Sequence, residues 1–444
     1  MSRLRSISTV LVAAALPLTG CLAIAGVSDF RVDESATEGG NTPDGTSPDG
    51  PGPGPDGGTD SPNDTNVDAN VPSPGLSDVT LASNTVGIGK TVVAILHARN
   101  ETGDRVNRVG GKVVFTQTEG NAAVTFSAVV DAGDGNYAAT VTGMKEGTAL
   151  KISATFDGAA LKTAAPTLRV ENVISTGLTM LLDPENADGL NHPGTNGCPG
   201  NGIATWADRS PNPLADGTLA DFADPCGGAT GSGWAGNGTS ANPHRLVFDG
   251  VDDYVSFGAV NALTKYTIVA FVKKTGAGVA GITGTGGFNP PNSVFPIVTK
   301  GTAESESDAI DINYHLSITQ AGKIGSDYEQ LGTSTNAPFS GTTTVSDNQW
   351  MMIATTLDAP TVRGVWLDGK DDGSSPGTLA PSGAASSRLV IGGANQSAAV
   401  TPDRGRFKGE LGLVLTYDRA LSKTEMEQTC RTFAARFGIA TCPK

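Results

Sequence analysis

Three aspartates, Asp249, Asp252 and Asp253, stand close together in the C-terminal half of the chain. They fall on one predicted turn between two apolar runs, so their carboxylates are expected to gather at one end of a sheet. Ca²⁺ takes six to eight oxygen ligands in proteins, and carboxylates at this spacing suit it. The sequence therefore predicts a Ca²⁺ site. In the alternative interpretation, Asp249 and Asp252 order the turn through backbone hydrogen bonds, and Asp253 is solvated.

A second set of residues has the chemistry to contact a sugar. Trp234 lies in one Gly-rich segment, and Phe288, Asn289 and Asn292 lie in another. An aromatic face offers an apolar surface, and a side-chain amide both donates and accepts hydrogen bonds. We expect these four residues to form a ligand-binding rim on exposed loops. In the alternative interpretation, Trp234 folds back onto the domain that carries it.

Catalytic residues are not predicted. A glycoside hydrolase needs two carboxylates that flank the bond to be broken. The E-x-D-x-(x)-E strand pattern with which one group of these enzymes, the β-glucanases, supplies them does not occur. The four histidines, His97, His192, His244 and His315, are far apart in the sequence and no motif pairs them. The sequence thus favours a binding protein over an enzyme. A hydrolase with an unrecognised site is the alternative, which paired carboxylates on a concave sheet face would support.

The first residues predict export. Arg3 and Arg5 precede an apolar run at 7–18, which is shorter than the roughly 20 residues that a membrane span needs, and the run ends in Leu-Thr-Gly-Cys at 18–21. This pattern predicts a signal peptide over residues 1–20. The tetrapeptide resembles the lipobox of bacterial lipoproteins, which implies that Cys21 carries the lipid. The resemblance implies anchoring in the bacterial outer membrane, with the domains facing the periplasm or the cell surface.

Cysteines and charge agree with an address outside the cytoplasm. Besides Cys21 the chain has Cys198, Cys226, Cys430 and Cys442, an even number for an oxidising compartment. Of the three possible connectivities we favour Cys198 with Cys226 and Cys430 with Cys442, because each closes a short loop. The net charge of −15 argues against nucleic-acid binding, which needs clustered basic residues.

Residues 21–75 are expected to be a lipidated N-terminus followed by a linker. From 39 to 75 the chain is mostly Gly, Pro, Asp, Asn, Ser and Thr, has no Lys or Arg, and repeats Pro-Asp-Gly three times. Such a segment cannot bury enough apolar surface to offset the entropy of ordering it. It is predicted to be a disordered, extended stalk.

Residues 76–172 are predicted to form a β-sandwich. Seven short runs of β-forming residues alternate with turn residues, at 78–82, 91–99, 112–118, 123–129, 137–143, 149–156 and 167–170. The segment D-A-G-D-G-N-Y at 131–137 resembles the turn of filamin-type and invasin-type immunoglobulin-like repeats. That resemblance implies an immunoglobulin-like domain acting as a spacer, with direct ligand binding as the alternative.

Residues 175–444 are long enough for a larger all-β domain. Predicted strands lie at 177–183, 266–273, 314–319, 352–357, 362–368 and 388–393, and further recognisable runs lie at 204–210, 245–257 and 406–422. The runs F-D-G-V-D-D-Y-V at 248–255 and F-K-G-E-L-G-L-V-L-T-Y-D-R-A-L-S at 407–422 resemble the laminin-G-like jelly roll of the concanavalin A-like lectin/glucanase superfamily. The resemblance implies a two-sheet sandwich that recognises carbohydrate or protein ligands, as in adhesion.

The chain is expected to close with a helix. Ser422 and Glu425 have capping-box spacing, and Met426, Cys430 and Phe433 fall on one face together with Phe437. The sequence as a whole thus predicts an all-β surface lipoprotein that binds carbohydrate or protein. A purely structural envelope component is a further alternative, which a jelly roll without a binding pocket would favour.

Overall fold

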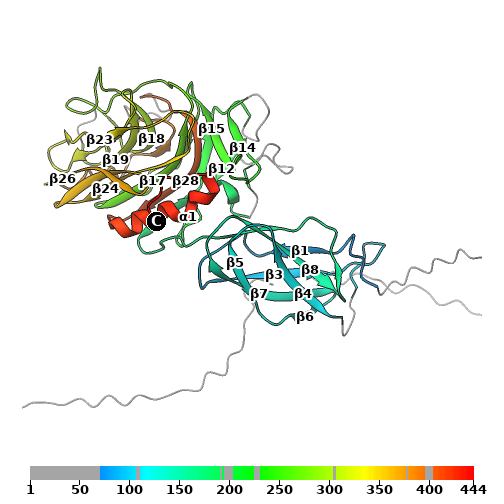
Figure 1. The fold of residues 1–444 in the computed structure, drawn as a ribbon. Coiled ribbons are helices and arrows are strands. Elements are labelled where there is room, and N and C mark those ends of the chain that lie inside the picture. The colour runs from blue at the N-terminus through cyan, green and yellow to red at the C-terminus, as the bar shows by residue number, and fades with distance from the viewer. Residues whose placement is uncertain are drawn as a thin grey trace, which may run out of the picture. The chain divides into compact units, whose positions relative to one another are not determined.

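The computed structural model describes residues 71–106, 111–190, 193–194, 204–224, 231–303, 307–376, 379–395 and 404–444. These residues form two β-sandwiches and one α-helix, which confirms the all-β fold class (Figure 1). Both sandwiches belong to one compact unit. Cys21, the signal peptide and the stalk lie outside the described residues. Within the described part of the chain, no helix has the length and apolar character needed to cross a membrane.

The first sandwich is built from strands whose side chains alternate between buried and more exposed. In β7, Tyr137, Ala139 and Val141 are buried, and the residues between them are partly exposed. Because successive side chains of a strand point to opposite faces, this pattern turns one face of each sheet to a shared core. All seven predicted runs contain a strand.

One sheet of this sandwich has the order β1-β3-β7-β5, with β6 paired to β7. Its strands are β1 (Asp78–Leu81), β3 (Thr91–His97), β5 (Ala123–Phe126), β6 (Val130–Gly133) and β7 (Asn136–Lys145). The other has the order β2-β10-β8-β4, with β9 paired to β8. Its strands are β2 (Thr85–Val86), β4 (Val113–Thr118), β8 (Leu150–Phe156), β9 (Ala159–Ala160) and β10 (Thr167–Val170). The resemblance to immunoglobulin-like repeats stays a prediction.

The second sandwich is the jelly roll, whose two eight-stranded sheets enclose the largest core cluster. The sheet that carries the helix has the order β14-β15-β28-β17-β24-β25-β26, with β11 paired to β28. Its strands are β11 (Leu178–Leu182), β14 (Gly233–Ala235), β15 (Arg245–Asp249), β17 (Tyr266–Lys274), β24 (Met351–Asp358), β25 (Val362–Leu367), β26 (Lys370–Pro376) and β28 (Lys408–Tyr417).

The facing sheet has the order β12-β13-β16-β27-β18-β19-β20-β23. Its strands are β12 (Thr205–Trp206), β13 (Gly217–Ala220), β16 (Tyr254–Ser256), β18 (Val294–Lys300), β19 (Tyr314–Thr319), β20 (Lys323–Asp327), β23 (Phe339–Thr344) and β27 (Leu389–Ile391). A short 3₁₀ helix η1 (Pro184–Asn186) follows β11, and β21 (Glu329–Gln330) pairs with β22 (Thr335–Asn336).

Helix α1 (Lys423–Phe437) covers the outer face of the sheet that contains β17 and β28 (Figure 1). Its predicted capping box is present, because the Ser422 hydroxyl accepts from the Glu425 amide and the Glu425 carboxylate accepts from the Ser422 amide. Met426 and Phe433 pack against that face. Both faces of β17 are therefore buried, which explains its nearly continuous apolar sequence.

Several strands were not predicted. The run Val294–Lys300 is buried at every position, so it lacks the alternation that marks a half-exposed strand. The strand Lys370–Pro376 was missed for a different reason, because it is a polar edge strand with almost no apolar residue. In both cases the strand is specified by its neighbours in the sheet.

Candidate functional site

The three aspartates predicted to bind Ca²⁺ do lie together. One carboxylate oxygen from each of Asp249, Asp252 and Asp253 falls within 4.8 Å of the others. Asp249 ends β15 and Asp253 directly precedes β16, so the turn between the two strands brings them side by side. Gly250 takes a left-handed φ of 81° in that turn, which a residue with a side chain adopts poorly.

Asp253 is the buried member of the group, not the solvated one that the turn-ordering alternative assumed. It is 1% exposed, accepts from the Ser232 hydroxyl at 2.8 Å and accepts from the Asp249 amide at 2.6 Å. Burial raises the pKa of Asp253 to about 7, against the lowering effect of these two hydrogen bonds. A bound cation would offset that cost, and the exposed Asp252 could complete the ligand set. Ca²⁺ binding stays a prediction.

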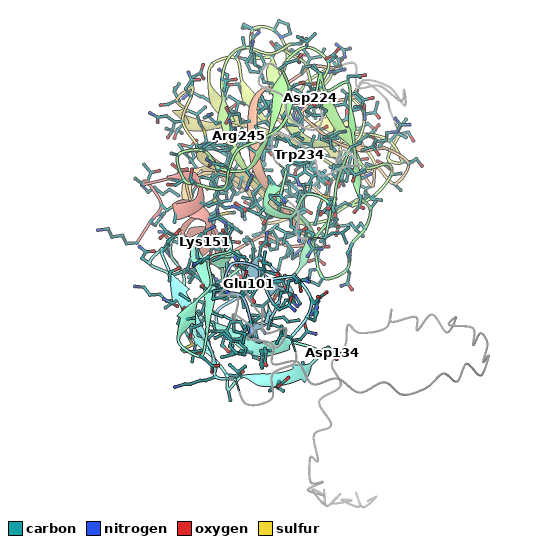
Figure 2. The ribbon with its side chains drawn as sticks, turned by 90° about the vertical axis from the view of Figure 1, so that its right-hand side faces the viewer. Glu101, Asp134, Lys151, Asp224, Trp234 and Arg245 are labelled. Carbon is teal, nitrogen blue, oxygen red and sulfur yellow. A yellow bond between two sulfur atoms is a disulfide. The ribbon has the colours of Figure 1, made fainter. Side chains whose placement is uncertain are left out.

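Trp234 does not form an exposed rim, and that prediction is wrong. The residue lies in β14 (Figure 2), which pairs with β15 and extends the sheet. Trp234 is 0% exposed. Its ring meets Trp206 edge to face with the centroids 5.4 Å apart. The Gly-rich surroundings suggested a loop, but the indole is part of the jelly-roll core.

The second predicted segment is only partly available to a ligand. Phe288 is 6% exposed, and its ring packs over Gly325 of β20, so it too is buried, contrary to the expectation of a rim aromatic. Asn289 is half-buried and Asn292 is exposed. This segment therefore offers amides without an accessible aromatic face.

Two buried carboxylates that were not predicted lie close together in the sequence, because Asp327 ends β20 and Glu329 begins β21. Asp327 is 0% exposed and accepts from the Thr283 hydroxyl and from two backbone amides, and Glu329 is 2% exposed and accepts from the Ile312 amide at 2.7 Å. Burial raises the pKa of Asp327 to about 7. Because both carboxylates are enclosed and bonded to the chain, they give no support to the hydrolase alternative.

The histidines that the structure describes form no metal site with other described side chains. His97 is hydrogen-bonded to Asn136 at 2.7 Å, while His315 is buried, which lowers its pKa to about 3. His192 lies outside the described residues. Among the described residues, the three aspartates are the single group of three or more His, Cys, Asp or Glu side chains that could hold a metal ion.

Of the two predicted disulfides, one is observed. Cys430 of α1 is bonded to Cys442, with the Cα atoms 5.6 Å apart. Cys198 and Cys226 lie outside the described residues. The observed bridge ties the C-terminal segment back onto the helix.

A hollow of about 550 Å³ opens beside Trp350, at the end of the jelly roll where this C-terminal segment lies. Trp350 is half-buried, and its ring centroid is 4.9 Å from that of Phe437 and 5.7 Å from the Lys273 ammonium. The aromatic ring is thus held in place while part of it remains accessible. Trp350 was not among the residues predicted from the sequence to contact a ligand.

Polar groups surround this indole. Thr343, Ser346 and Gln349 are exposed and line the hollow. The opposite wall is the segment after α1, held because Thr441 donates to Asp368 in the β25–β26 turn. A partly exposed aromatic ring with hydroxyl and amide groups around it can bind a ligand that has both an apolar face and hydroxyl groups. The signal in the sequence was Gln349-Trp350 after a polar turn.

The comparisons with known proteins concern the jelly roll. Residues 249–427 match the family model described as the concanavalin A-like lectin/glucanases superfamily. The match begins at the last residue of β15 and ends within α1, so it contains both the aspartate group and Trp350. No curated protein matches the chain.

Solved structures show weak similarity. Domain 4 of the GH43 extracellular arabinanase from Geobacillus stearothermophilus, in complex with arabinotriose, is 15% identical with a TM-score of 0.35, over 57% of this chain and 98% of that chain. The CBM40 of the Ruminococcus gnavus IT-sialidase, bound to alpha2,3 sialyllactose, is 18% identical with a TM-score of 0.29, over 37% and 82%. The binding domain of Paraclostridial Mosquitocidal Protein 1 is 11% identical with a TM-score of 0.37, over 58% and 52%.

Proposed function

We propose that the jelly roll, whose residues 249–427 match the family model of the concanavalin A-like lectin/glucanases superfamily, binds carbohydrate in the hollow beside Trp350. The observation that carries the proposal is the partly exposed indole in a hollow of about 550 Å³. Pockets of this size hold small ligands. A sugar ring has one face of C–H groups and an edge of hydroxyl groups, which matches an indole bordered by hydroxyls and an amide.

The hollow is positioned by rigid elements. Phe437 supports the indole from α1, and the α1 face that carries Phe437 is packed on the sheet. The wall formed by Thr441 is fixed by its hydrogen bond to Asp368 and by the neighbouring Cys430–Cys442 bridge. A site held in this way spends little entropy on ordering when a ligand arrives, which favours affinity.

We infer that the protein presents this domain outside the cytoplasm through lipidated Cys21 and the acidic stalk. The inference rests on the sequence of residues 1–75. A lipid anchor would keep a carbohydrate-binding domain at the envelope, where polysaccharides are concentrated. Metabolic labelling with a palmitate analogue tests it: the chain should take up label, and Cys21→Ser should take up none. Label retained by that variant would contradict the anchor.

A glycan array tests the binding proposal. The full chain should bind a defined class of oligosaccharide, and Gln349→Ala should weaken that binding. Asn292→Ala is the matched control, because it removes an exposed amide from the Gly-rich segment instead of the hollow. Equal binding by the wild type, Gln349→Ala and Asn292→Ala, or a loss of binding in Asn292→Ala alone, would show that the binding site is not the hollow beside Trp350. An array without any saturable binding would favour a protein ligand or a structural role.

A further inference from the structure

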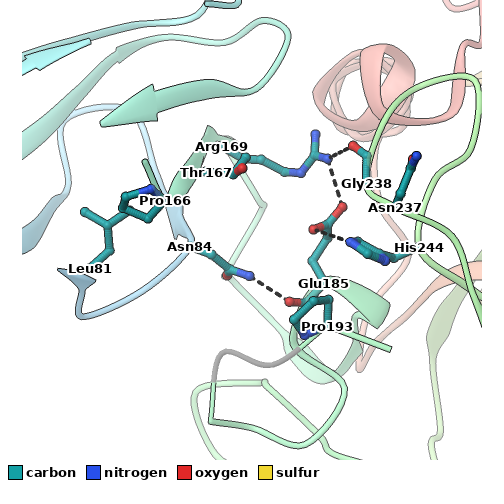
Figure 3. Close-up of a pocket in the computed structure, with 10 residues that line it drawn as sticks. All are labelled: Leu81, Asn84, Pro166, Thr167, Arg169, Glu185, Pro193, Asn237, Gly238 and His244. Atoms are coloured by element: carbon teal, nitrogen blue, oxygen red, sulfur yellow. Dashed lines mark hydrogen bonds and ion pairs between the residues drawn. The ribbon is translucent and has the colours of Figure 1, made fainter. Parts of the chain in front are cut away.

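A second hollow, of about 300 Å³, lies where the two sandwiches meet (Figure 3). Asn84, Thr167 and Arg169 line it from the first sandwich, and Glu185 and His244 line it from the jelly roll. Leu81, Pro166 and Pro193 supply an apolar side. Its lining therefore combines a small apolar surface with charged and amide groups, and it comes from both sandwiches.

Glu185 is the central group of this hollow. It is 6% exposed, and its Oε1 accepts from Arg169 Nη2 at 2.8 Å. The same guanidinium nitrogen donates to the Gly238 carbonyl at 2.6 Å, and the Asn84 amide donates to the Glu185 carbonyl at 2.7 Å. Glu185 is thus held by both sandwiches, and one of its oxygens, Oε2, faces His244 (Figure 3).

His244 presents an acceptor to that oxygen. It is 6% exposed, and its Nδ1 lies 3.1 Å from the Gly194 carbonyl. Because a carbonyl oxygen only accepts, Nδ1 carries the hydrogen, and in the neutral ring Nε2 is then an acceptor. Burial lowers the pKa of His244, with Arg436 and Arg169 acting in the same direction and Glu185 opposing them. The neutral ring is therefore the form expected at neutral pH.

Two acceptors thus face each other, and none of the described residues donates a hydrogen bond to either atom. Glu185 Oε2 and His244 Nε2 are 3.8 Å apart, beyond hydrogen-bonding distance. The space beside Nε2 is open because position 238 is a glycine with a φ of 77°, and a Cβ there would stand 3.0 Å from Nε2. Both residues are largely buried, but these two atoms remain accessible from the hollow, so a ligand can reach them. A ligand that brings two donors would satisfy both.

The neighbouring charges decide the class of that ligand. Arg169 and Arg436 both approach Glu185 Oε1, at 2.8 and 3.5 Å, so this carboxylate is already paired with guanidinium groups and a cationic ligand would have to compete with them. Hydroxyl groups donate without bringing charge, and two of them on adjacent carbons match two acceptors this close together. We propose that the hollow is a second ligand site, which binds one neutral sugar ring through adjacent hydroxyls donating to Glu185 Oε2 and His244 Nε2.

This site is separate from the hollow beside Trp350, with which it shares no lining residue. It gives the first sandwich a part in binding through Asn84, Thr167 and Arg169, which a simple spacer would not have. The volume of about 300 Å³ fits a single ring better than an oligosaccharide. A terminal sugar or a free monosaccharide is the matching ligand.

Calorimetric titration of the full chain with free monosaccharides and their methyl glycosides tests the proposal. At least one sugar with adjacent free hydroxyls should bind saturably at pH 7.5, and Glu185→Gln should weaken it at least about tenfold, because the new amide supplies its own donor to His244 Nε2. Glu101→Gln, on an exposed loop residue of the first sandwich, is the matched control and should bind normally.

A ligand-side test needs no variant, so it holds even if Glu185→Gln unfolds. Replacing either of the two adjacent hydroxyls by hydrogen should weaken binding by at least about tenfold. Absence of saturable binding by every sugar would overturn the proposal, since the two acceptors would then be bridged by water alone. Binding unchanged in a folded Glu185→Gln variant, or tighter binding of a primary alkylamine than of any sugar, would overturn it as well.

Discussion

Arg436→Met removes the one cation that contacts three buried carboxylates at the base of the jelly roll. The Arg436 guanidinium, 3% exposed, bonds to Asp183 through both terminal nitrogens and lies 3.4 Å from Glu171 and 3.5 Å from Glu185. Burial alone would lower the pKa of Arg436, but the three carboxylates raise it above its usual range. The guanidinium therefore stays charged and neutralises the buried Asp183 and Glu171, while Glu185 is also paired with Arg169 at 2.8 Å.

The cost of this substitution follows from the burial of the partners. Methionine keeps the helix propensity and the apolar stem beside Phe433 and Phe437. What is lost is the charge, and removing one partner from a buried ion pair costs about 3–5 kcal/mol. Arg431→Met is the matched control on α1, because Arg431 is 36% exposed and only 3.9 Å from Glu427. That pair should contribute about 0.5 kcal/mol or less.

Denaturant unfolding followed by tryptophan fluorescence measures both variants, since all four tryptophans lie in the jelly roll. The loss of unfolding free energy caused by Arg436→Met should be larger at pH 8 than at pH 5, because carboxylates left without Arg436 can take up protons at the lower pH. Burial already raises the pKa of Glu171 to about 7 with the arginine present. A loss below about 1 kcal/mol, or a loss that grows on acidification, would refute the reasoning.

Three more predictions concern other buried or linked groups. Burial raises the pKa of Asp327 to about 7, so the folded chain retains a proton that the unfolded chain releases between about pH 4 and 7. As the pH rises from about 4 to 7, the unfolding free energy of the wild type should therefore fall relative to that of Asp327→Asn, by on the order of 4 kcal/mol. A difference between the two proteins that does not change with pH would contradict this prediction. Millimolar Ca²⁺ should raise the melting temperature of the wild type but not of Asp252→Asn, and equal effects on both would exclude the aspartate site. In oxidising buffer the unfolding free energy of Cys442→Ser should be about 3 kcal/mol lower than that of the wild type, and a reductant should lower it no further. Equal stability of the two proteins in oxidising buffer would show that the bridge is dispensable.

The features that were predictable from the sequence depend on local patterns. Alternation along β7 and β8 marks the first sandwich, and the Ser422–Glu425 capping box marks the start of α1. Cys430 and Cys442 are separated by only 12 positions, so their pairing could also be predicted from nearby residues. In these cases a few neighbouring residues contain the physical reason for the structure.

The site residues were less predictable because burial is decided by distant parts of the chain. Trp234 was expected in an exposed loop, yet its burial comes from pairing with β15 and from contact with Trp206. Glu185 and His244 are 59 positions apart by residue number, and nothing local to either residue shows that the fold brings them within 3.8 Å. Trp350 was visible in the sequence, but the hollow beside it depends on the segment after α1.

The affinity of the full chain for its array-selected oligosaccharide, compared between Trp350→Ala and Trp366→Ala, tests carbohydrate binding most directly. Both substitutions remove a half-buried tryptophan of the jelly roll, but Trp350 lines the hollow, whereas Trp366 does not and donates to the Thr356 hydroxyl. The proposal predicts a loss of at least about tenfold, or about 1.4 kcal/mol, for Trp350→Ala and wild-type affinity for Trp366→Ala. Wild-type affinity in a folded Trp350→Ala protein would contradict it.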